Sequence, residues 1–159
     1  MATRSFSDPA AYRGKVYHLK PLFDWINRDY FSGSVKCKLA WGRVRASRVR
    51  RVRQLGRFEP RANRIVLNPV LDQAGVPVFV VASVLHHEMC HAVVPAKRRS
   101  GYTEFHGPEF KALERKFRDY RAARDWIRAN RKFLFQPARN HVTAAVPAEA
   151  PEQLSLRLF

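Results

Sequence analysis

The sequence predicts an α+β domain, and three features carry that prediction. Apolar residues recur at three- and four-residue intervals over residues 17–31, and again after residue 108, as they do along one face of a helix. Residues 76–85 are apolar almost all round, which predicts that the helix to which they belong is largely buried. Between the first two helices, three segments have the composition of strands: residues 35–41, 48–58 and 64–68.

The expected elements follow in chain order. The opening helix over residues 17–31 ends at Ser32-Gly33-Ser34. We expect the three strands to form a small antiparallel sheet, as a hairpin or a meander. Pro77 lies near the first turn of the buried helix, where its missing N–H costs nothing, and Pro95 ends that helix. A polar loop over residues 96–107 then leads to a C-terminal helix that Pro108 opens.

The length of 159 residues predicts one domain with a substantial core. We place it at residues 17–135, after a flexible N-terminus over residues 1–16. Residues 136–159 are rich in Ala, Pro and Glu, and we expect a mobile or loosely docked tail there. The two cysteines, Cys37 and Cys90, lack the spacing of a disulfide framework or a Cys-type zinc site, and we interpret Cys90 as a packing residue.

Two histidines and a glutamate lie in the buried helix as His87-Glu88-x-x-His91. Positions i and i+4 share one face of a helix, so both rings can reach one metal ion. Zinc fits this pattern, because a catalytic zinc site takes three protein ligands and leaves a position for water. The alternative is a pair of core histidines satisfied by hydrogen bonds, and the cost of burying unpaired polar groups argues against it.

The third ligand has to come from another part of the chain. His106 lies in the polar loop, and Gly107-Pro108 gives a sharp entry to the next helix that directs the imidazole inward. The sequence therefore predicts His106 as the third ligand. Tyr102 in the same loop is a candidate for stabilising an oxyanion, although a packed or exposed tyrosine explains it equally well. The other ligand candidates are the acidic residues and three histidines, His18, His86 and His141.

Several of these motifs occur together in one known family. The segment His87-Glu88-Met89-Cys90-His91, followed by Phe105-His106-Gly107-Pro108-Glu109-Phe110-Lys111, resembles the SprT-like family, whose eukaryotic members include DNA–protein-crosslink proteases. The resemblance covers about residues 17–118. Further segments resemble the opening helix and the strands of that family: residues 22–31, 39–42, 55–58 and 65–68.

The resemblance implies a zincin-like peptidase fold. It places His87, His91 and His106 on Zn²⁺ and makes Glu88 the catalytic base. Many members carry a C-terminal zinc ribbon built from cysteines. No cysteine follows Cys90 here, so we expect the catalytic core to bind DNA without a ribbon.

The charge of the chain points to a polyanionic partner. Thirty Lys and Arg against 13 Asp and Glu give a net charge of +17, and such an excess does not help the compact state. We expect sequence-independent binding to single-stranded or distorted DNA through phosphate contacts. A solvated basic face is the alternative. The candidate contacts are Arg43, Arg45, Arg48, Arg50, Arg51, Arg53, Lys97, Arg98 and Arg99.

The functional hypothesis joins these observations. The chain is expected to be a zinc-dependent endopeptidase that degrades DNA-bound or DNA-crosslinked proteins, with Glu88 activating the water. The alternatives are a metal-dependent hydrolase of another substrate, and a basic nucleic-acid-binding module with a structural metal. The N-terminus has no apolar signal region and no run of 18 apolar residues occurs, so we expect a cytoplasmic monomer without membrane contact.

Overall fold

A computed structural model describes residues 9–43 and 54–135 of the chain. These residues form an α+β fold, as the sequence predicts. The helices are α1 (Pro9–Tyr12), α2 (Leu19–Phe31), α3 (Val78–Val93), α4 (Pro108–Glu114), α5 (Tyr120–Ala129) and α6 (Arg131–Phe135), with short 3₁₀ turns η1 (Pro60–Ala62) and η2 (Pro69–Leu71). The strands are β1 (Lys38–Trp41), β2 (Gly56–Glu59), β3 (Arg64–Leu67), β4 (Lys97–Arg99) and β5 (Tyr102–Glu104).

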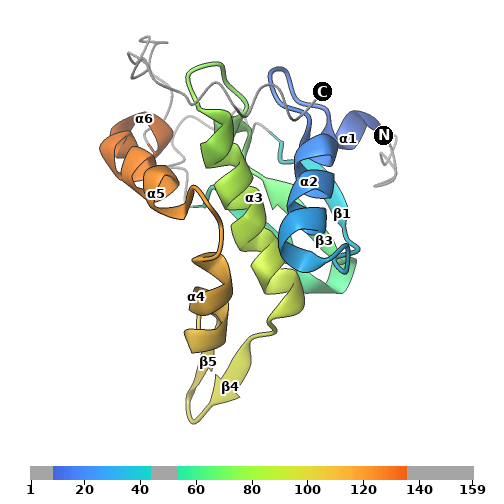
Figure 1. Cartoon of the computed structure of the whole chain (residues 1–159), viewed down its shortest axis with the longest axis vertical. Coiled ribbons are helices and arrows are strands. Elements are labelled where there is room, and N and C mark those ends of the chain that lie inside the picture. Colours follow the sequence, from blue (N-terminus) through green and yellow to red (C-terminus); the bar gives the residue numbers. More distant parts are fainter. Residues whose placement is uncertain (1–8, 44–53, 136–159) are drawn as a thin grey trace.

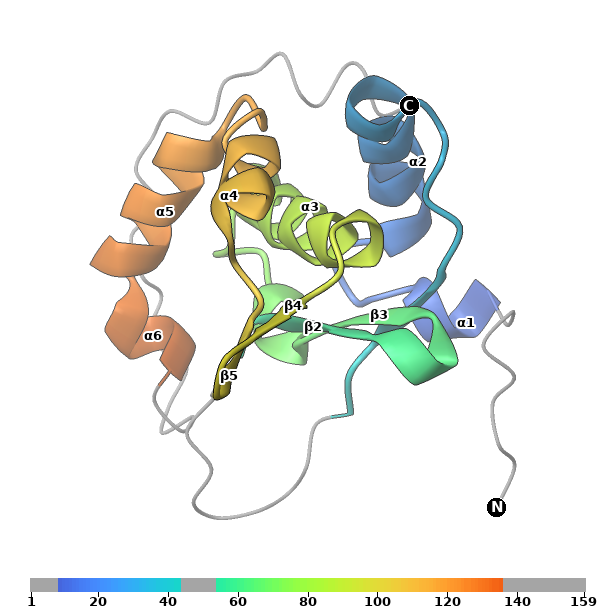
Figure 2. The same ribbon diagram turned by 90° about the horizontal axis from the view of Figure 1, so that it is seen from below.

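Helix α3 is the centre of the fold. It lies against the sheet of β1, β2 and β3, with α2 on one side and with α4 and α5 on the other (Figures 1 and 2). Val80, Val81 and Leu85 of α3 are completely buried. The apolar run that predicts a buried helix is therefore matched by neighbours on several sides.

Helix α2 is the opening helix that the sequence predicts, although it begins at Leu19 rather than at residue 17. Leu19, Leu22 and Ile26 are buried at the three- and four-residue spacing of one helix face. The helix ends where Ser32 adopts a left-handed conformation with φ of 52° and donates its backbone N–H to Asn27 O. Gly33 follows at φ 71°, which glycine adopts without strain.

The three-stranded sheet is mixed, and the prediction of an antiparallel sheet is wrong. The strand order is β1-β3-β2, with β3 antiparallel to β2 but parallel to β1. Successive strands do alternate in direction. The chain leaves β1 at one edge, enters β2 at the opposite edge, and returns through η1 so that β3 lies between them.

The composition of the strands explains this order. Ile65, Val66 and Leu67 are all buried, as in a central strand that is covered on both faces. No residue of β2 is buried to that extent, and β2 forms an edge of the sheet. The strand predicted over residues 48–58 is observed only as β2, since residues 44–53 lie outside the described part of the chain.

The described residues before α2 make defined contacts with the rest of the domain. Helix α1 packs against β1. The carboxylate of Asp72 then accepts hydrogen bonds from the backbone N–H groups of Lys15, Val16 and Tyr17, so one side chain fixes the entry to α2. A Cβ atom at Gly14 would collide with this carboxylate, which explains a glycine there.

The C-terminal part also differs from the prediction. The polar loop over residues 96–107 contains a hairpin of β4 and β5, which turns at Gly101 with φ 83° and extends beyond the end of α3 (Figure 1). The single closing helix is three short helices, α4, α5 and α6. None of the helices in the described residues has the length and apolar character that crossing a membrane requires.

Candidate metal centre and active-site cleft

His87 and His91 lie on the side of α3 that faces α4. They are four residues apart, and their ring centroids are 5.0 Å apart, as expected for positions one turn apart on a helix. His106 approaches them from the segment between β5 and α4. Its ring centroid lies 5.2 Å from that of His87 and 4.8 Å from that of His91.

The three imidazoles converge on one point. One ligand nitrogen from each of His87, His91 and His106 lies within 4.8 Å of the other two, and Nε2 of His106 is 3.1 Å from Nε2 of His91. Three nitrogens on one tetrahedral zinc ion would be about 3.3 Å apart, from the usual bond length and angle. The three histidines are therefore positioned to bind a metal ion, and the all-nitrogen donor set fits zinc.

Phe110 packs against the rings of all three histidines. It is completely buried, and its ring centroid lies 5.0, 4.5 and 4.7 Å from those of His87, His91 and His106. Burial, followed by the charges of the neighbouring histidines, lowers the pKa of His91 to about 4, so its ring is neutral and keeps a lone pair for a metal. Pro108 at the start of α4 sets the turn that brings Phe110 into place.

A carboxylate that the sequence does not single out completes the cluster. Glu114, the last residue of α4, accepts a hydrogen bond of 2.6 Å from Nδ1 of His87. This contact makes Nδ1 the protonated nitrogen and leaves Nε2 of His87 for a metal ion. Burial raises the pKa of Glu114, but the hydrogen bond and nearby positive charges outweigh it and hold the pKa below its usual range.

Glu88 lies on α3 beside the three histidines and is 5% exposed. Burial raises the pKa of Glu88 to about 7, against the lowering effects of His87, of the Phe58 backbone N–H and of Arg57. Strand β2 reaches this carboxylate closely. A Cβ atom at Gly56 would lie 2.9 Å from Oε1 of Glu88, so the glycine leaves room for the side chain.

An open cleft of about 910 Å³ contains the histidines and Glu88. One wall comes from β2 and the residues before it, and another from α3. The far wall consists of residues that the sequence does not mark as functional: Glu114, Tyr120, Arg124 and Ile127. The site is thus accessible to a molecule much larger than water.

His86 takes no part in this cluster. It is 1% exposed and packs among Tyr30, Phe31 and Phe117, with ring centroids 5.2, 5.2 and 5.0 Å away. Cys90 Sγ lies 3.7 Å from Nδ1 of His86 and is buried in the core, in line with its interpretation as a packing residue. His18 stands at the start of α2, and His141 lies outside the described residues.

Only some of the predicted nucleic-acid contacts can be placed. Arg45, Arg48, Arg50, Arg51 and Arg53 lie outside the described residues, whereas Arg43 is exposed after β1.

Lys97, Arg98 and Arg99 form β4 and are all exposed. Lys97 pairs with Glu109 at 3.2 Å and Arg99 with Glu104 at 3.1 Å. Such exposed ion pairs are weak, so Lys97 and Arg99 can readily exchange these carboxylates for other anions.

Three aromatic residues outside the metal cluster have different surroundings. Trp126 is buried, and Trp41 donates its indole N–H to Tyr17 O, so both serve the packing of the domain. Tyr102 is 59% exposed on β5 and is not among the residues that line the cleft. The structure therefore gives no support to Tyr102 as an oxyanion ligand.

Comparison with known proteins adds one finding. The family model described as the SprT-like family matches residues 19–132. This range begins with α2, ends in α6 and includes the three histidines. Neither the curated proteins nor the solved structures give a match to the chain.

Proposed function

Because the chain belongs to the SprT-like family, a family of metallopeptidase-like domains, we propose that it is a zinc-dependent endopeptidase that degrades proteins bound or crosslinked to DNA. The observation that carries the proposal is the convergence of His87, His91 and His106 beside a buried Glu88 in an open cleft. Three nitrogen donors, a carboxylate and free access are what metal-assisted hydrolysis requires.

Each residue has a separate part in the reaction. His87, His91 and His106 hold the ion, and the hydrogen bond to Glu114 fixes the ring of His87. Zinc, when bound, polarises the scissile carbonyl and increases the acidity of a water molecule. Glu88 accepts a proton as the water oxygen adds to the carbonyl carbon. It then gives that proton to the amide nitrogen as the C–N bond breaks.

The shape of the site argues against a purely structural metal. Structural zinc sites are usually closed by four protein ligands. In the described part of the chain, the cluster offers three histidines, and it opens into the cleft of about 910 Å³. Glu114 is already bonded to His87 Nδ1, so its carboxylate is engaged beside the cluster.

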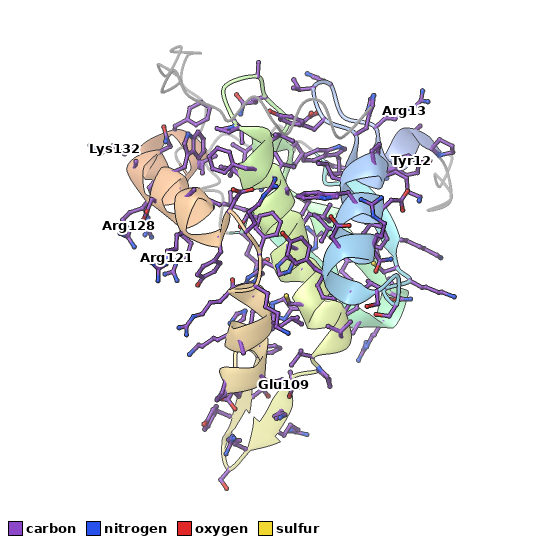
Figure 3. All side chains as sticks on the ribbon, viewed as in Figure 1. Tyr12, Arg13, Glu109, Arg121, Arg128 and Lys132 are labelled. Carbon is purple, nitrogen blue, oxygen red and sulfur yellow. The ribbon has the colours of Figure 1, made fainter. Side chains whose placement is uncertain are left out.

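The DNA part of the proposal is supported by charge. The net charge is +17, and Lys97, Arg98 and Arg99 are exposed on β4. Arg121, Arg128 and Lys132 also project from the outer side of α5 and α6, away from α3 (Figure 3). Arginine favours bidentate phosphate contacts, and a protein held on DNA would be concentrated beside the cleft by such contacts.

The test compares the wild type with Glu88→Gln on a protein crosslinked to single-stranded DNA, with zinc supplied. We expect the wild type to cleave the protein and Glu88→Gln to lose at least about a thousandfold in rate, in keeping with the loss of a general base. Zinc content, measured by elemental analysis, stays the same in both. Glu109→Gln is the matched control, because Glu109 is exposed and lies outside the cleft.

Three outcomes would contradict the proposal. If Glu88→Gln turns over substrate as fast as the wild type, Glu88 is not the catalytic base. If the wild type binds zinc but cleaves no protein, the proposed peptidase activity is wrong. DNA affinity that stays constant between about 50 and 200 mM salt removes the phosphate contacts, since each contact releases counterions and weakens with salt.

A further inference from the structure

Tyr120 is the first residue of α5 and lines the cleft together with His106 and Glu114. Its side chain is half-buried and forms part of the cleft wall. The part of the cleft wall that α5 contributes is therefore not only apolar. It carries the hydroxyl group of Tyr120, which has no part in the steps assigned to Glu88 and the three histidines.

Arg124 holds this phenol from one turn further along α5. Nη1 of Arg124 donates a hydrogen bond of 2.6 Å to the phenol oxygen of Tyr120, and the guanidinium carbon lies 5.3 Å from the ring centroid. A guanidinium group only donates, so the phenol oxygen is the acceptor in this contact. The hydroxyl hydrogen of Tyr120 remains available to a second acceptor.

The pair lines the same cleft as the three histidines. Arg124 and Glu114 are both among the residues that line it. Glu114 in turn is bonded to His87. A scissile peptide bound in this cleft would therefore have both the three histidines and the available phenol hydrogen in the surrounding walls.

We propose that Tyr120, positioned by Arg124, donates a hydrogen bond to the carbonyl oxygen of the scissile peptide as that oxygen becomes negatively charged. This inference rests on the proposed peptidase function. The water oxygen bonds to the carbonyl carbon, and the π electron pair of the C=O bond moves to the carbonyl oxygen. Tyr120 keeps its proton throughout. Glu88 takes the proton of the water and returns it to the leaving nitrogen.

The competing side chains are less suitable for this role. Tyr102 is exposed on the hairpin and does not line the cleft. Arg57 does line the cleft, but its Nε is bonded to Oε1 of Glu59 at 2.8 Å. Tyr120 lines the cleft, and Arg124 orients its phenol while the hydroxyl hydrogen stays available.

The test is the isosteric variant Tyr120→Phe, measured with zinc-loaded protein on a peptide substrate without DNA. We expect kcat to fall by about a hundredfold, as for the loss of one oxyanion donor, with KM and zinc content unchanged. Arg124→Gln should lower kcat by a smaller factor, because the phenol remains but is no longer oriented. Tyr102→Phe is the matched control, with kcat as in the wild type.

A binding measurement makes the role independent of turnover. A phosphonamidate peptide, which imitates the tetrahedral intermediate, should bind Tyr120→Phe about a hundredfold more weakly than the wild type. A product peptide should bind both equally. An unchanged kcat in Tyr120→Phe, or a higher KM with an unchanged kcat, would overturn the inference. A wild type that cleaves no peptide contradicts the proposed function instead, so the two failures can be told apart.

Discussion

His86 and His87 are neighbours in the sequence and have opposite surroundings in the structure. His86 is 1% exposed and lies among Tyr30, Phe31 and Phe117. His87 lines the cleft and has its Nδ1 bonded to Glu114. One step along α3 rotates the side chain by about 100°, which is enough to move it from the core to the site.

The difference shows that polar partners, rather than residue type, separate a ligand from a packing residue. Burial lowers the pKa of His86 to about 4, so its ring is neutral. Its Nε2 has no hydrogen-bond partner among the described residues. His87 instead has a carboxylate on one nitrogen and two further imidazoles beside the other. These are the usual surroundings of a metal-binding histidine.

The largest expected effect is on the metal itself. His87→Ala should abolish both zinc binding and peptide hydrolysis, because two imidazoles cannot hold the ion in a catalytic geometry. Elemental analysis and a peptide assay measure the two quantities. Should His87→Ala keep stoichiometric zinc, the ion would have to be bound by a different group of residues.

An intermediate effect is expected from the carboxylate partner of His87. Glu114→Gln keeps the shape of the side chain but removes its negative charge. Zinc affinity, measured by competition with a chelator, should fall by about 10- to 100-fold, as is usual for such partners of a ligating histidine. Circular dichroism should show an unchanged fold. Wild-type zinc affinity in this variant would mean that the contact only packs α4 against α3.

The sequence predicts the part of the site that lies within one element. His87, Glu88 and His91 are related by helical spacing, and the apolar run around them predicts their helix. His106 could also be proposed, since Gly107 and Pro108 mark a turn into the next helix. These inferences need only local geometry.

Contacts that depend on tertiary structure could not be predicted in the same way. Glu114 and Tyr120 become part of the site only because α4 and α5 pack against α3. The position of β3 between β1 and β2 also depends on tertiary packing, because alternating strand directions fit a meander equally well. The β4–β5 hairpin consists of charged and polar residues, without the apolar alternation that predicts a strand.

The smallest effect is expected from replacing His86. His86→Phe replaces an imidazole that has an unpartnered buried nitrogen with an apolar ring, in surroundings that are already aromatic. Burying a polar atom without a partner is unfavourable, so the free energy of unfolding should rise by about 1 kcal/mol. Zinc content and kcat should equal those of the wild type.

Chemical denaturation with zinc present measures this change, and the same samples give zinc content. A loss of more than about 2 kcal/mol is larger than the strain of one added ring atom explains, and it would mean that the imidazole has a polar partner such as a bound water molecule. A loss of zinc would mean that the two histidines are coupled through α3. An unchanged zinc content together with a higher free energy of unfolding would show that His86 serves packing alone, although its side chain is only about 100° around the helix from that of His87.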